Sequence, residues 1–107
     1  MKVEDQIRIV RELVEDYFDK NSEYSIKDKA TRTWERAHIV AIGTSVLCTK
    51  WDIGYPGGSF VQAVVNNNLM QAVSSADPTN IHALKFYVQL MYNNSMPEEL
   101  WLVKTNS

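Results

Sequence analysis

The sequence is short of several residue types and patterns whose presence would point to a particular class of protein. Cys48 is its one cysteine, which excludes an intramolecular disulfide. Its 13 acidic residues outnumber its 11 basic ones, and the formal net charge of −2 argues against the basic surplus that bulk nucleic-acid binding requires. No apolar run approaches the ~20 residues that a membrane span needs. We therefore expect a soluble intracellular protein that binds neither bulk nucleic acid nor a membrane.

Catalytic and metal-binding motifs are also missing. The two histidines, His38 and His82, lie far apart, and neither has a second ligand at a metal-binding spacing. We expect His38 to be a hydrogen-bonded core residue and His82 to lie at the surface. Cys48 has no neighbouring histidine or CxxC partner, so we expect a buried, unreactive thiol. The glycine spacing matches no phosphate-binding loop or dinucleotide fingerprint. The sequence predicts no catalytic residues, no metal ligands, no cofactor and no enzymatic activity.

Charge is distributed unevenly along the 107 residues, a length that fits a single domain, 1–107. Most charged residues lie within the first 36 positions, whereas between Ile53 and Pro97 only Asp77 and Lys85 carry a charge. The chain therefore has a solvated N-terminal third and an unusually neutral C-terminal part.

The spacing of apolar residues predicts an all-α fold. A first amphipathic helix is indicated by apolar residues three and four apart, namely Val3, Ile7, Val10, Val14 and Tyr17. A second helix begins at Ser25, or instead at Thr31 or Thr33, and runs through Cys48. It is apolar on more than one side, so we expect it to be the central, most buried helix. Gly43 within it costs about 1 kcal/mol of helix propensity relative to alanine, so we expect another helix to approach closely there.

A third helix is predicted over residues 59–76. Ser59 followed by Gln62 forms a capping-box pattern, which places the N-cap at Ser59. Asparagines at Asn66–Asn68 are mediocre helix formers, but we expect one helix because the apolar spacing continues through them. Its apolar face carries Val61, Val65, Leu69, Ala72 and Ala76.

Two more helices complete the prediction. Asp77-Pro78 gives a start signal, and Asn93-Asn94 end that helix because asparagine tolerates the left-handed cap conformation. Ser95 and Glu98 cap a short last helix. The apolar stripe of the longer helix carries Ile81, Leu84, Val88 and Met91. The predicted architecture is a compact all-α bundle of four helices plus a short C-terminal helix.

The segment IGYPGGSF, residues 53–60, concentrates the glycines of the chain and carries no charge. Its Gly-Gly-Ser precedes a helix whose first residues include no acid. Helix N-termini expose unpaired N–H groups, and nearby aromatic rings can stack a planar group. Two arginines one helical turn apart are available for phosphate contacts. The candidate ligand-binding residues are Trp51, Tyr55, Gly57, Gly58, Ser59, Arg32 and Arg36. In the alternative interpretation the Gly-Gly pair supplies only the positive φ of a loop, and Ser59 only caps a helix.

The helix after the glycines is rich in amides and lacks charge. Solvated helix faces usually carry Lys and Glu, so an amide-rich face favours a binding surface. An interface with another subunit or protein explains it at least as well as a small ligand does. The candidate interface residues are Gln62, Asn66, Asn67 and Gln71.

Residues 55–93 resemble small proteins encoded by bacterial viruses. The resemblance rests on Pro56-Gly57-Gly58-Ser59-Phe60, Ala63-Val64, Asn67-Asn68-Leu69, Ala76-Asp77, Asn80, Ala83-Leu84 and Tyr92-Asn93. The similar proteins commonly carry an acid where this chain has Asn68. The resemblance implies a small, non-enzymatic viral accessory protein that acts in the host cytoplasm.

Two functions follow from these features. In the first, the protein counters host defence by sequestering a small anionic, nucleotide-derived signal at the glycine-rich helix N-terminus. In the second, it is an inhibitor that binds a host protein through the neutral Asn/Gln-rich helix face. A homo-oligomer fits either function, because a small chain with a neutral surface helix gains buried area by pairing.

Overall fold

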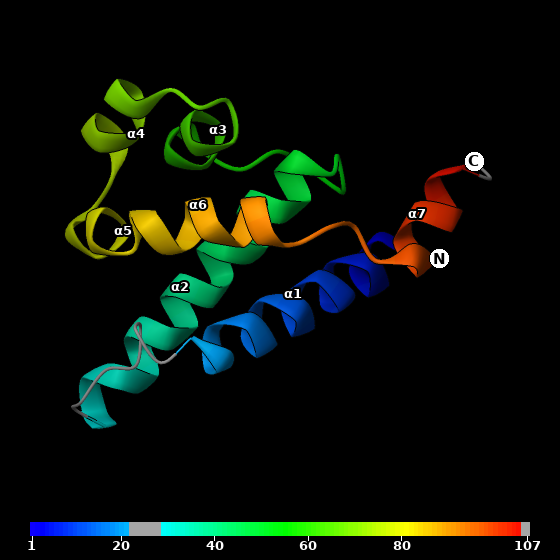
Figure 1. Cartoon of the computed structure of the whole chain (residues 1–107), viewed down its shortest axis with the longest axis horizontal. Coiled ribbons are helices and arrows are strands. Elements are labelled where there is room, and N and C mark those ends of the chain that lie inside the picture. Colours follow the sequence, from blue (N-terminus) through cyan, green and yellow to red (C-terminus); the bar gives the residue numbers. More distant parts are fainter. Residues whose placement is uncertain (22–28, 106–107) are drawn as a thin grey trace.

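The chain folds into α-helices without strands in the parts that the structure describes. The computed structural model describes residues 1–21 and 29–105, and the side chains of residues 1–21 and 35–102. Within these ranges there are seven helices (Figure 1): α1 (Val3–Lys20), α2 (Lys29–Lys50), α3 (Ser59–Val65), α4 (Leu69–Ser75), α5 (Pro78–His82), α6 (Leu84–Asn93) and α7 (Glu98–Thr105). The all-α prediction is confirmed. The four-helix count is not, because two of the predicted helices are each divided.

The second helix is central, as its sequence predicts. It contacts α1, α3, α5 and α6, and in Figure 1 α6 crosses it while α1 lies beside it. Gly43 lies at this crossing: a Cβ there would be 3.0 Å from Cγ1 of Val14 on α1 and 3.1 Å from Cδ2 of Leu90 on α6. The expected close approach of another helix is confirmed, and two helices make it. Thr31 and Thr33 are already helical and do not start α2, whereas Ser25 lies outside the described residues.

The asparagine run divides the predicted helix 59–76. Asn67 has a φ of +57°, and the Oδ1 atom of Asn68 accepts a hydrogen bond from the backbone N–H of Gln71 at 3.1 Å, capping α4. Short amide side chains can replace the backbone hydrogen bonds that a turn gives up. The chain then returns, and α4 packs against α3. The apolar spacing continues through the run because each of the two short helices buries part of the apolar stripe, Val61 on α3 and Ala72 on α4.

The helix predicted after Asp77-Pro78 is also interrupted. Asp77 caps α5 as expected, its Oδ1 atom accepting from the N–H of Asn80 at 2.7 Å. The buried Ala83, with φ −94° and ψ 6°, then separates α5 from α6. Asn94 follows α6 with φ −125° and ψ 129°, so the expected left-handed cap is wrong. Its side-chain amide instead donates to the carbonyl of Leu90 at 2.8 Å.

Aromatic rings connect helices that are distant in sequence. Phe18 on α1 packs edge-on to Phe86 on α6, with ring centroids 5.5 Å apart. Tyr87 follows, at 5.9 Å from Phe86 and 5.8 Å from Phe60 on α3. The hydroxyl of Tyr87 donates to Oδ1 of Asn80 at 2.8 Å, and burial raises the pKa of this hydroxyl. The core therefore includes side chains from α1, α3 and α6.

The two histidines and the cysteine lie where the sequence predicted, in or near the core for His38 and Cys48 and at the surface for His82. His38 is partly buried, and its Nε2 atom lies 3.3 Å from Oδ2 of Asp77, which links α2 to the start of α5. His82 is exposed, as expected. Cys48 is buried, and burial raises the pKa of its thiol to about 11, so little reactive thiolate exists at neutral pH. Over the described residues, no helix is long and apolar enough to cross a membrane.

Candidate functional site

The glycine-rich turn is tied into the fold at Gly57. The N–H of Gly57 donates to Oγ1 of Thr49 at 2.9 Å, and its carbonyl accepts from the side-chain amide of Gln62 at 2.6 Å. A Cβ at Gly57 would lie 2.5 Å from Oγ of Ser45 and 2.6 Å from Cγ1 of Val61. Gly57 therefore lets the loop lie against α2, and its backbone polar groups are already bonded within the chain.

Neither Gly57 nor Gly58 has a positive φ. The left-handed positions in this part of the chain are Asp52, at φ +57°, and Gly54, at φ +68°. Gly58 has φ −71° and ψ −169° and is itself the N-cap of α3, so Ser59 is the first helical residue and the expected Ser59 cap is wrong. Gly57 is required for close packing, whereas no heavy atom lies within 4 Å of a Cβ built on Gly58.

Of the two aromatic residues proposed for stacking on a ligand, one is buried and one is exposed. Trp51 is only 8% exposed and belongs to the core, with its backbone N–H donating to the carbonyl of Leu47 at 2.8 Å. Tyr55 is 96% exposed. The ring of Trp51 is not available for stacking with a ligand at the surface.

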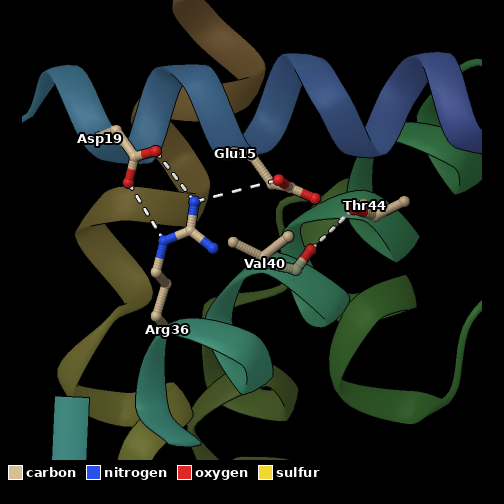
Figure 2. Close-up of polar contacts among 5 residues, drawn as sticks. All are labelled: Glu15, Asp19, Arg36, Val40 and Thr44. Carbon is tan, nitrogen blue, oxygen red and sulfur yellow. Dashed lines mark hydrogen bonds and ion pairs between the residues drawn. The ribbon is translucent and has the colours of Figure 1, made fainter. Parts of the chain in front are cut away.

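Arg36 binds to α1 and not to the glycine turn. Its Nε and Nη2 atoms hold the two carboxylate oxygens of Asp19 at 3.1 and 2.9 Å, and Nη2 is 4.0 Å from Oε2 of Glu15 (Figure 2). The hydrogen bond to Asp19 raises the pKa of the Arg36 guanidinium. Ser45, which contacts the turn, lies about 13 Å farther along α2 at 1.5 Å per residue. The side chain of Arg32 is outside the described ones.

A hollow between α1 and α2 borders this ion pair. It has a volume of about 480 Å³ and is lined by Arg11 and Glu15 together with apolar residues such as Ile7 and Val40. Thr44 at its wall donates to the carbonyl of Val40 at 2.7 Å (Figure 2). Of the two arginines that line the hollow, Arg36 is already compensated by Asp19 and Glu15.

The amide residues proposed as an interface gather at the turn between α3 and α4, except for Gln62. Asn66, Asn67 and Gln71 are exposed there. Gln71 also accepts, through Oε1, a hydrogen bond from the side chain of Asn68 at 3.2 Å. Gln62 instead faces the glycine turn, through its bond to Gly57. Some of these amide side chains therefore stabilise the chain itself: Gln62 the glycine turn, and Gln71 with Asn68 the start of α4.

Beside this turn lies a surface that the apolar spacing did not predict. Two hollows share Val64, Asn67 and Val88, and we call them together the α3/α6 groove. The smaller, of about 50 Å³, is also lined by Ala63, Asn68, Leu69 and Leu84. The larger, of about 250 Å³, is also lined by Lys50, Val65, Met91 and Tyr92.

Large apolar side chains border the α3/α6 groove and remain in contact with solvent. Leu69 is 66% exposed, Val88 48% and Tyr92 89%. The apolar stripes predicted along residues 59–76 and 78–92 are therefore only partly buried. The sequence signal for this surface was the scarcity of charge between Ile53 and Pro97, where only Asp77 and Lys85 are charged. Apolar spacing alone did not show which face of the molecule this neutral segment forms.

Comparisons with known proteins give no relative: no family model, curated protein or solved structure matches the chain. Among the described residues, no group of three or more His, Cys, Asp or Glu side chains is placed to hold a metal ion.

Proposed function

We propose that the chain is a non-enzymatic protein-binding protein that holds a segment of its partner in the α3/α6 groove. One observation carries the proposal: Leu69, Val88 and Tyr92 surround adjoining hollows and are exposed by 48% or more. Contiguous exposed apolar side chains on a small protein are typical of interaction sites, and tyrosine is enriched among residues that dominate binding energy.

The composition of the groove supports a protein partner. Its lining is apolar apart from two asparagines and one lysine, which matches the charge-depleted centre of protein interfaces. Every lining residue except Lys50 comes from residues 55–93, the segment that resembles small proteins of bacterial viruses. On that resemblance, the partner is a host protein and the chain acts as its inhibitor.

Sequestration of a nucleotide-derived signal at the glycine turn has less support. That site would need free backbone N–H groups, a stacking ring and an uncompensated arginine. Gly57 donates its N–H to Thr49, and Arg36 is paired with Asp19. Of the two candidate rings, Trp51 is buried and only Tyr55 is exposed.

Two exposed tyrosines provide a matched test. Tyr92→Gln removes a ring from the α3/α6 groove, whereas Tyr55→Gln removes a ring near the glycine turn, and both side chains are almost fully exposed. We expect tagged wild-type protein and Tyr55→Gln to retain the same protein from bacterial lysate. Tyr92→Gln should bind it at least about 30-fold more weakly, as for an interface hot spot.

The melting temperature of both variants should equal that of the wild type, because neither ring is buried. Retention of the same protein by all three forms would contradict the proposal. Native mass spectrometry of protein purified from bacteria provides the second readout. A nucleotide-sized mass that Tyr55→Gln loses and Tyr92→Gln keeps would favour the glycine turn instead.

A further inference from the structure

We propose that the α3/α6 groove selects an apolar partner segment that carries an acidic side chain, and that this carboxylate pairs with Lys50. The inference rests on the proposed protein-binding function and specifies the chemistry of the partner. Three features support it: the position of Lys50, the unequal size of the two hollows, and the absence of an acid in the groove.

Lys50 is the single charged residue that lines the groove. It is the last residue of α2, and its Nζ atom donates to the carbonyl of Met91 on α6 at 2.9 Å. That bond uses one of the three ammonium donors and holds the charge beside the larger hollow. No acid lines either hollow. A carboxylate that approaches between apolar walls gains more from this charge than it would in open water.

The hollows differ in size and lie in a fixed order from Lys50. The larger one, about 250 Å³, includes Lys50, Met91 and Tyr92. It exceeds the roughly 150 Å³ of an apolar cavity that accommodates a benzene-sized group. The smaller one, about 50 Å³, includes Leu69 and Leu84 and suits a smaller side chain. Leu84 and Met91 are about 10 Å apart along α6. The matching segment therefore presents an acid, then a large apolar side chain beside it, then a small apolar side chain farther on.

A second copy of this chain does not provide that acid from the same face. Between Ile53 and Pro97 the one acidic residue is Asp77, and it caps α5 and lies 3.3 Å from His38. Two copies pairing groove to groove would each present the same lining, as a two-fold interface requires, and no acid is among those lining residues. A segment of another protein that carries an acid beside apolar side chains would pair with Lys50 and fill the hollows at the same time.

Selection from a displayed library of random short peptides tests the proposal. We expect the wild-type protein to enrich peptides with Asp or Glu next to a large apolar residue. Lys50→Glu should instead enrich Lys or Arg at that position and keep the apolar residues. A peptide selected on the wild type should bind Lys50→Glu at least tenfold more weakly by fluorescence anisotropy. Lys20→Glu makes the same change in net charge on the exposed surface of α1 and should leave that affinity unchanged.

Each other outcome overturns the inference. Peptides that require Tyr92 but show no acid preference, or that bind Lys50→Glu as well as the wild type, would leave protein binding in place and exclude the Lys50 pairing. Failure to enrich peptides that require Tyr92 would count against the proposed function as well. A dimer in sedimentation experiments that Tyr92→Gln dissociates would assign the groove to a second copy.

Discussion

Replacing Trp51 by alanine should lower the free energy of unfolding by about 3–5 kcal/mol, the range for truncating a buried tryptophan or phenylalanine. The indole is 8% exposed and belongs to one core cluster with Leu47, Ile53 and Phe60. Removing it leaves a cavity at the end of α2, where the chain turns toward the glycine-rich segment. Urea unfolding followed by far-ultraviolet circular dichroism measures the loss without relying on the fluorescence of the deleted residue.

Trp51→Phe is the matched control. It keeps a ring in the core and should cost clearly less than Trp51→Ala. The sequence offered a different role for this residue, stacking on a ligand, and the two roles give opposite results. If Trp51→Ala has the same urea midpoint as the wild type, the ring does not stabilise the core, and that result would favour the hypothesis that it stacks on a ligand.

Gly57→Ala should destabilise the protein by about 1–3 kcal/mol, as overpacking does. The added methyl would lie 2.5 Å from Oγ of Ser45 and 2.7 Å from Cβ of Val61. Neither neighbour is the free end of a long side chain, so the loop or the start of α3 has to move. The same displacement stretches the bond from the Gly57 N–H to Thr49. Thermal and urea unfolding both report the change.

Gly58→Ala, one residue later, is expected to change the free energy of unfolding by less than about 1 kcal/mol in either direction, because alanine is a poorer N-cap than glycine but restricts the unfolded chain more. Its backbone is in a region open to all residues, and no atom lies near the new methyl. Equal losses from the two substitutions would mean that packing against Ser45 is not what requires glycine at position 57.

Local rules predicted much of the fold. The 3.6-residue spacing of apolar side chains identified the helical class, because a helix needs one buried stripe whatever covers it. Asp77 followed by proline caps its helix through contacts within a few residues. Gly43 was also interpreted correctly, since a helix interior tolerates glycine at a cost that close packing of a second helix can offset.

The features that sequence reasoning missed depend on residues far apart in the chain. Spacing shows that Leu69 and Val88 belong to apolar stripes, but not whether another element covers them. Trp51 follows a helix and precedes glycines, a position compatible with a pocket or with the core. Only the packing of other elements around it determines which of the two its ring occupies. Asn67 could be helical or left-handed, and the return of α4 onto α3 favours the left-handed turn. The candidate groove depends on the exposure of Leu69 and Val88 and on the turn at Asn67, and so could not be predicted from local sequence.

The series of ring contacts from Phe18 through Phe86 and Tyr87 to Phe60 has a spectroscopic consequence. Rings held rigidly in asymmetric surroundings give near-ultraviolet circular dichroism, and that signal is lost when side chains become mobile even if helices persist. Because the rings belong to α1, α6 and α3, one optical signal reports the docking of all three. A variant that releases any of them should lose near-ultraviolet ellipticity while its far-ultraviolet spectrum remains helical.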